Sequence, residues 1–228
     1  MLDFGFYNMD CMDGMREFPD KYFELAIVDP PYGGVTKGGY MSNKVSGGKA
    51  RNRNDYILDL WSQAAPDKSY FGELFRVSKN AVIWGGNYFI EQINRNSQCW
   101  LVWDKVKPDG VMYADAELAW TSFDQATKMF HFQWNGMLQG DMKNKEHKIH
   151  PTQKPVKLYK WILQNFATNG DRILDTHVGS ASSLIACEDM GFKYVGFELS
   201  EAYYKLANER LKTHKSQVSI MDIMGDWR

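Results

Sequence analysis

An acid, two prolines and a tyrosine follow one another as "DPPY" at positions 29 to 32, directly after the apolar run "ELAIV". The run predicts a buried strand, and proline suits such packing poorly because it donates no backbone N–H and stiffens the chain. An acid, two rigid residues and an aromatic ring at the end of a strand therefore indicate chemistry at that position. The candidate catalytic residues are Asp29, Pro30, Pro31 and Tyr32.

A second site is predicted between residues 172 and 200, which read as strand, glycine-containing turn, helix and strand. Asp175 ends the first strand and Glu198 ends the second. Ligands of open α/β sheets bind outside the carboxyl ends of the strands, where an acid about 20 residues after the turn can hold ribose hydroxyls. The G-x-G-x-x-G pattern is absent, and an acid at the turn suits a cationic ligand such as a sulfonium. This favours S-adenosylmethionine over NAD, while a tight turn without function would read similarly.

Short apolar runs between turn signals predict the strands that would position these residues. They cover residues 24–29, 80–86, 99–104, 172–176 and 194–199, with further alternating or aromatic-rich strands at 117–123 and 128–134. Helices are expected from Pro155 to about residue 167, from the N-cap Ser200 onward, and over 180–190 before Gly191. This alternation predicts an α/β fold, with a mostly parallel twisted sheet and helices on both faces.

The length of 228 residues, 44% of them hydrophobic, suits one globular domain over 1–228. Residues 33–54 are expected to form a mobile basic loop, and residues 104–148 a small insertion. The tail from residue 213 is left open between an edge strand and a free end. No signal peptide or membrane-spanning run is read, and Cys11, Cys99 and Cys187 are expected to be buried thiols in a reducing cytoplasm.

The net charge of -1 does not indicate nucleic acid, but the basic residues are unevenly distributed. Residues 33–54 contain five basic residues and no acid, and residues 140–160 contain six lysines against two acids. Basic segments on a mildly acidic body predict a local anion-binding face, although solvated loops would give the same pattern.

A third motif, "IHPTQKP" at 149–155, precedes the helix before the Asp175 strand. Together with "DPPY" and "DTHVGSAS…FELS", it resembles the DNA amino-methyltransferases, which act on adenine N6 or cytosine N4. The order, with the tetrapeptide first and the cofactor turn last, is similar to the circularly permuted β arrangement of that family. The stretch "WGGNYF" at 84–89 is similar to small phage or prophage members. The resemblance covers about residues 7–32, 80–89 and 149–211, and implies a Rossmann-like methyltransferase fold in the cytoplasm of a bacterial host.

The resemblance implies cofactor contacts outside the second site. Asp10 and Cys11, within "NMDCMDG", would lie beside the adenine of S-adenosylmethionine. Lys154, with His150 and Thr152, would hold the methionine carboxylate. Each of these could instead be an ordinary surface or loop residue, and the pair of histidines in "HKIH" is not accompanied by further metal ligands, so no metal is expected.

Within the second site, the resemblance implies that Asp175 and the turn of Gly179 and Ser180 cradle the methionine, and that Glu198 takes the ribose hydroxyls. The sequence departs from the family turn Asp-Pro-Phe-x-Gly-Ser-Gly, because Thr-His replaces Pro-Phe and alanine replaces the last glycine. His177 would either line the pocket or cap it.

Within this family an exocyclic amine must be made nucleophilic although its lone pair is delocalised into the ring. Asp29 and the Pro30 carbonyl would each accept one N–H as the nitrogen becomes tetrahedral, which is the mirror image of an oxyanion hole. Tyr32 would stack on a base flipped out of the duplex. The aspartate favours adenine N6, with cytosine N4, RNA methylation and a non-catalytic nucleic-acid-binding module as alternatives.

DNA is the expected partner, and dimer formation is an alternative that the sequence leaves open. Lysine and arginine side chains supply affinity through phosphate contacts. The residues expected to meet DNA are Lys37, Lys44, Lys49, Arg51 and Arg53. Residues 104–148 are expected to recognise the target sequence.

Overall fold

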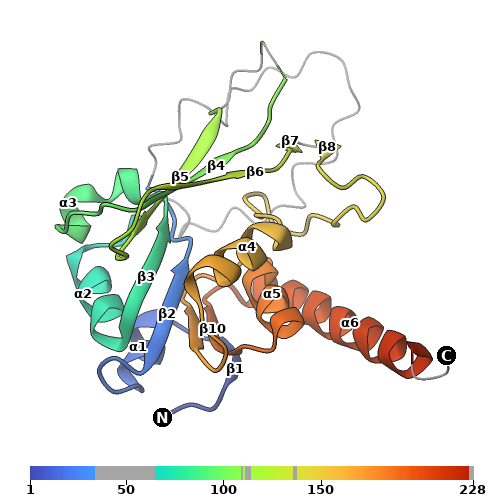
Figure 1. The fold of residues 1–228 in the computed structure, drawn as a ribbon. Coiled ribbons are helices and arrows are strands. Elements are labelled where there is room, and N and C mark those ends of the chain that lie inside the picture. Colours follow the sequence, from blue (N-terminus) through green and yellow to red (C-terminus); the bar gives the residue numbers. More distant parts are fainter. Residues whose placement is uncertain (34–64, 109, 111–113, 136–137, 226–228) are drawn as a thin grey trace.

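The structure is a computed structural model that describes residues 1–33, 65–108, 110, 114–135 and 138–225. Within these residues, eight strands form one sheet in the order β1-β10-β9-β2-β3-β5-β4-β6 (Figure 1). In that order the strands are Gly5–Asn8, Lys193–Glu198, Arg172–Asp175, Phe23–Val28, Ser78–Trp84, Ala116–Thr121, Trp100–Asp104 and Lys128–His131. A separate hairpin pairs β7 (Trp134–Asn135) with β8 (Leu138–Gln139).

The first five strands in this order are parallel, and β5 then runs antiparallel to both β3 and β4. β2 lies between β9 and β3, with Ala26 level with Leu174 on one side and Ala81 on the other. The carboxyl ends of β2, β9 and β10 therefore face the same edge of the sheet. This edge is where Asp29, the turn after Asp175 and Glu198 come together.

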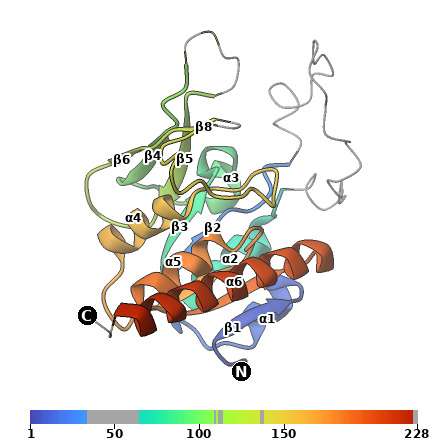
Figure 2. The same cartoon turned by 90° about the vertical axis from the view of Figure 1, so that its right-hand side faces the viewer.

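Helices cover both faces of the sheet (Figure 2). One hydrophobic cluster packs α4 (Val156–Phe166), α5 (Ser182–Met190) and α6 (Glu201–Gly225) on one face. The other packs α1 (Cys11–Arg16), α2 (Lys68–Val77) and α3 (Ile90–Ile93), with a short 3-10 turn, η4 (Gly86–Tyr88), after β3. None of the helices in the described part of the chain combines the length and apolar composition that a membrane span needs.

The expected α/β architecture is confirmed, and all seven expected strands are present within one or two residues at their starts. The expected helix signals also hold: Ser200 precedes α6, and Gly191 ends α5 with a left-handed φ of 73°. Residues 104–148 are only partly an insertion, because β5 and β6 join the central sheet. The tail is not an edge strand, because α6 continues to Gly225. No helix-breaking glycine or proline occurs between residues 201 and 224.

Candidate active site

The Asp29 carboxylate lies one residue beyond the end of β2 and is held through both of its oxygens. The Tyr32 hydroxyl donates to Oδ1 across 2.7 Å, and the Lys154 ammonium donates to Oδ2. The same ammonium lies 3.3 Å from the Tyr32 hydroxyl oxygen. Each carboxylate oxygen has a second lone pair, so Asp29 keeps acceptor capacity for another donor. Its side chain is 16% exposed, whereas that of Lys154 is only 4% exposed.

A second carboxylate stands on the other side of Lys154. Oε2 of Glu117, on β5, lies 3.2 Å from the ammonium, and its Oε1 accepts from Lys105. Burial alone would lower the pKa of Lys154, but Asp29 and Glu117 raise it above its usual value. Burial alone would raise the pKa of Glu117, but Lys154 and Lys105 lower it to about 2. Two acids and two lysines therefore alternate at this position, in the order Asp29, Lys154, Glu117 and Lys105.

The Tyr32 ring is fixed by the turn that follows β3. It stacks on Tyr88 with 5.1 Å between ring centroids and meets Phe89 edge-on at 5.9 Å. Gly85 has a φ of 68°, and a Cβ built there would lie 2.2 Å from the Tyr32 ring. A left-handed glycine is thus required both by the backbone and by the close approach of the ring. Burial and the Asp29 charge raise the pKa of the phenol well above its usual value, so it stays a donor.

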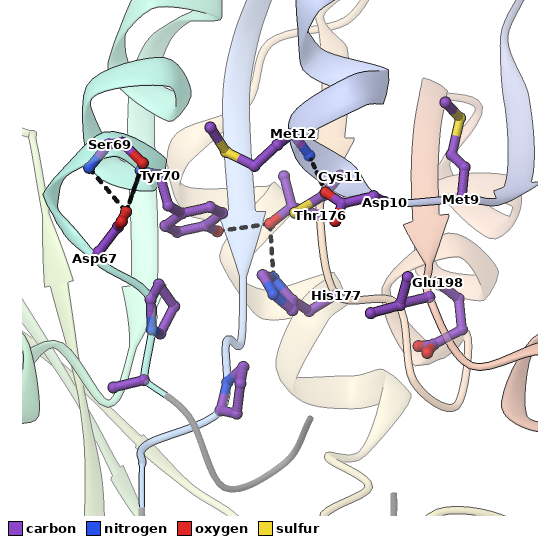
Figure 3. A pocket seen from close by; sticks show the side chains of 14 residues that line it. Met9, Asp10, Cys11, Met12, Asp67, Ser69, Tyr70, Thr176, His177 and Glu198 are labelled. Carbon is purple, nitrogen blue, oxygen red and sulfur yellow. Dashed lines mark hydrogen bonds between the residues drawn. The ribbon is translucent and has the colours of Figure 1, made fainter. Parts of the chain in front are cut away.

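A cavity of about 310 Å³ opens beside the tetrapeptide of residues 29–32 (Figure 3). Five of the residues expected at the site line it together, namely Asp10, Cys11, Pro31, His177 and Glu198. The cavity thus connects the tetrapeptide to the turn after β9. The lining residues that sequence reasoning did not single out for the site are Met9, Met12, Ala65, Pro66, Asp67, Ser69, Tyr70, Thr176 and Leu199.

Asp10 and Cys11 enter the cavity at the start of α1. Asp10 caps the helix by accepting from the backbone N–H of Met12 at 2.7 Å. Burial, followed by the Asp10 charge, raises the pKa of the Cys11 thiol to about 12, so the thiol stays neutral. Cys11 is only half-buried, unlike Cys99 and Cys187, which are buried as expected.

Glu198 ties the end of β10 to the turn after β9. One carboxylate oxygen accepts from the Gly179 N–H and the other from the Ser200 N–H, each at 2.9 Å. The side chain is almost fully buried but lines the cavity. Two backbone donors therefore fix the Glu198 carboxylate at the cavity wall.

A chain of polar groups joins α2 to the turn. The Tyr70 hydroxyl lies 2.6 Å from Oγ1 of Thr176, which lies 2.9 Å from Nδ1 of His177 (Figure 3). Burial lowers the pKa of His177 to about 4, so its imidazole is neutral at pH 7. His177 thus lines the pocket, which was one of its two expected positions. Tyr70 was missed because it is separated from the turn by 106 residues.

The remaining expected cofactor residues lie outside the cavity lining. Oγ1 of Thr152 lies 3.1 Å from Nδ1 of His150, whose ring packs edge-on against Tyr203 and beside Gly179. Lys154 is engaged by Asp29 and Glu117. A role for Lys154 in holding the methionine carboxylate stays a prediction, and in this structure its ammonium already has two anionic partners.

The Asp175 side chain is buried and does not belong to the cavity lining. Its Oδ1 accepts from the His177 N–H at 2.9 Å, and its Oδ2 accepts from the Ser183 hydroxyl. Burial raises its pKa to about 7, opposed by these two donors. Ser180 is also buried, and its carbonyl accepts from Arg210. The expected contact between Asp175 and a cationic ligand stays a prediction.

The expected DNA contacts fall on Lys37, Lys44, Lys49, Arg51 and Arg53, which all lie outside the residues that the structure describes. Among the described residues, no group of three or more histidine, cysteine or acidic side chains could hold a metal ion.

A family model described as DNA methylase, for N6 and N4 methyltransferases, matches residues 43–209. This match covers more than half of the chain, so the protein belongs to the DNA amino-methyltransferase family. Two curated relatives are similar along most of the chain. The type II methyltransferase M.HinfI of Haemophilus influenzae is 24% identical, over 95% of this chain and 70% of its own length. M2.DpnII of Streptococcus pneumoniae is 26% identical, over 90% of this chain and 70% of its own length.

Solved structures share the fold at low sequence identity. A crystal structure of M1.HpyAVI in complex with SAM is 18% identical with a TM-score of 0.56, covering 90% of this chain and 98% of that one. The PvuII DNA methyltransferase, described as cytosine-N4-specific, is 12% identical with a TM-score of 0.58. That match covers 96% of this chain and 93% of the PvuII chain.

Proposed function

We propose that this protein transfers a methyl group from S-adenosylmethionine to the N6 amine of an adenine flipped out of DNA. The observation that carries the proposal is the shared cavity: Pro31 of the tetrapeptide forms one wall, and Asp10, His177 and Glu198 form others. A donor bound there would lie against the motif that receives the base. Family membership supports methylation of an amino group of a DNA base. The choice of adenine over cytosine is the more specific part of the proposal.

The cavity fits an adenosyl group in size and in chemistry. Ligand pockets typically enclose about 300–1,000 Å³, and this one encloses about 310 Å³. Met9, Met12 and Leu199 offer apolar contacts for a base, while Asp10 and Glu198 offer carboxylate oxygens to hydroxyl donors. When bound, S-adenosylmethionine supplies an electrophilic methyl carbon on a sulfonium. The complex of M1.HpyAVI with SAM supports the same donor for this fold.

The chain's own groups act on the amine. Asp29 accepts one amine N–H and the Pro30 carbonyl accepts the other, which localises the nitrogen lone pair and stabilises the charge that develops on it. Because Asp29 is fixed by Tyr32 and Lys154, these acceptors need little reorganisation. Asp29→Ala is expected to abolish methyl transfer and to leave cofactor affinity largely intact. Near-normal transfer by the purified variant would show that this role is wrong.

Cytosine N4 is the second candidate, since the PvuII enzyme of similar fold is cytosine-N4-specific. Aspartate as the first residue of the tetrapeptide favours adenine. The deciding experiment incubates the protein with radiolabelled S-adenosylmethionine and mixed-sequence unmethylated DNA, and then digests the DNA to nucleosides. Label in N6-methyl-2′-deoxyadenosine supports the proposal, and label in N4-methyl-2′-deoxycytidine supports the alternative. Absence of label in DNA, with cofactor bound, would favour a non-catalytic nucleic-acid-binding module, and a parallel reaction with RNA tests the remaining alternative.

A further inference from the structure

Lys154 and Glu117 form an ionic support for Asp29 that the expected role of Lys154 does not require. Lys154 immediately precedes the proline that caps α4, while Glu117 lies on β5, and the tetrapeptide follows β2. The three side chains therefore come from three different parts of the chain. A lysine charge that is only 4% exposed is costly unless it is paired, and here it has one carboxylate on each side.

The backbone around Asp29 is rigid, so the direction of its carboxylate is what neighbouring side chains can control. Its backbone is followed by two prolines of fixed φ, so rotation of its own side chain is the main freedom left to the carboxylate. Lys154 and the Tyr32 hydroxyl each occupy one oxygen and remove that freedom. Lys154 is itself held by Glu117, whose second partner is Lys105.

We propose that Lys154 and Glu117 are positioning residues, which keep the Asp29 carboxylate aimed at the incoming amine. This inference rests on the proposed function, because it concerns the group that would receive the base. It replaces the expected contact between Lys154 and the methionine carboxylate. It also gives β5, from the range expected to recognise the target, a direct connection to the reacting site.

The two residues act on Asp29 in series, because Lys154 contacts its carboxylate and Glu117 holds Lys154. Lys154→Met should therefore lower the rate of methyl transfer more than Glu117→Gln, which leaves the contact between Lys154 and Asp29 in place.

The experiment measures single-turnover methyl transfer from radiolabelled S-adenosylmethionine to mixed-sequence unmethylated DNA at pH 7. Lys154→Met is expected to lower the rate about 100-fold through misplacement of Asp29, with little change in the Kd for S-adenosylhomocysteine. Lys157→Met, at an exposed lysine on α4 paired with Asp141, is the matched control and should keep the wild-type rate. An unchanged rate for Lys154→Met, or a larger loss of rate for Glu117→Gln, would overturn the proposal. So would a weakened Kd with a retained rate, which would restore the cofactor-carboxylate role.

A second measurement does not depend on activity. If the ion pair is as described, Lys154→Met leaves the partly buried Asp29 without its cation and lowers Tm, and adding Asp29→Asn to it restores part of the loss. Simple addition of the two single effects would overturn the pairing even if Lys154→Met folds poorly. If wild-type protein methylates no nucleic acid, the proposed function fails, and this stability cycle still decides whether Lys154 supports Asp29.

Discussion

The hydroxyl of Tyr32 donates a hydrogen bond of 2.7 Å to Oδ1 of Asp29, across the two prolines that separate them. The last side chain of the tetrapeptide therefore orients the first. The tyrosine has two separable functions in this arrangement: its ring packs on Tyr88, and its hydroxyl fixes a carboxylate. Proline at both intervening positions keeps the spacing constant, so the hydrogen bond is a property of the motif itself.

Tyr32→Phe tests the hydroxyl alone. A hydrogen bond to a charged group contributes about 1.5–3 kcal/mol, so the single-turnover rate is expected to fall at least about 10-fold. The ring contacts with Tyr88 and Phe89 are kept in this variant. Tyr32→Ala should lower the rate further, because the packing of the ring is also lost. Equal rates for Tyr32→Phe and wild-type protein would contradict an orienting role for the hydroxyl.

Gly85→Ala tests the close approach to Tyr32. The substitution places a Cβ 2.2 Å from the ring and also puts a side chain on a φ of 68°. Gly191→Ala is the matched control, because its φ is 73° and nothing lies within 4 Å of the added Cβ. Both variants should lose about 1–2 kcal/mol of unfolding free energy from the left-handed backbone. Only Gly85→Ala should lose more than this, because its Cβ also displaces Tyr32. Urea unfolding measures the loss of stability, and methyl transfer measures the effect of the displacement.

Glu198→Gln tests the carboxylate at the end of β10. An amide can accept at only one of the two positions where Gly179 and Ser200 now donate, and the ligand loses a charged acceptor. The Kd for S-adenosylhomocysteine, measured by calorimetry, is expected to rise about 10–100-fold. Glu201→Gln, at an exposed site three residues further on, should bind normally. An unaltered Kd for Glu198→Gln would remove this residue from the cofactor site.

Asp175 should make the fold less stable as pH rises from about 4 to about 7. Burial raises its folded-state pKa to about 7, above the unfolded value near 3.8. The folded state therefore holds a proton in this range that the unfolded chain releases, so the stabilisation is present at low pH and declines toward pH 7. Urea midpoints measured across this pH range should therefore fall as pH rises. Asp175→Asn, which keeps an oxygen for the His177 N–H, should remove that slope. A slope identical to that of wild-type protein would mean that Asp175 is ionised throughout.

The basic segment is tested by the salt dependence of DNA binding. Replacing Lys44, Lys49, Arg51 and Arg53 with glutamine should weaken binding and flatten the slope of log K against log salt. On duplex DNA, the slope should decrease by about 0.9 for each phosphate that the variant no longer neutralises. Lys79→Gln with Lys193→Gln is the control, because these lysines lie at the amino ends of β3 and β10, opposite the Asp29 edge. An unchanged slope in the first variant would place the DNA-binding residues elsewhere.

Local signals in the sequence predicted the central sheet well. Apolar runs marked β2, β3, β4, β9 and β10 because buried parallel strands need continuous apolar side chains. The missed elements carry weaker signals: β1 has four residues that are not fully buried, and α1 has only six residues. α2 was missed although Asp67 caps it, because its charged start follows a polar segment that reads as loop.

The site was predicted in its residue types more than in its contacts. Asp10, Glu198 and the tetrapeptide were recognised by motif, and they gather at one edge because parallel strands present their carboxyl ends together. The Lys154 contact with Asp29 joins residues 125 positions apart, and no local spacing reports such a pair. The inward turn of Asp175 depends on Ser183, at the start of α5, and so on a side-chain direction that sequence does not show.

The order of strands has a consequence for biosynthesis. β1 pairs with β10, and β2 pairs with β9, so the amino-terminal strands are partnered by residues 172–198. A nascent chain emerging from the ribosome must therefore keep the apolar strand before Asp29 unpaired on one side until residues 172–175 have been synthesised. Such long-range closure slows folding and exposes strand edges. The reacting end of β2 is thus completed only after about 150 further residues have left the ribosome.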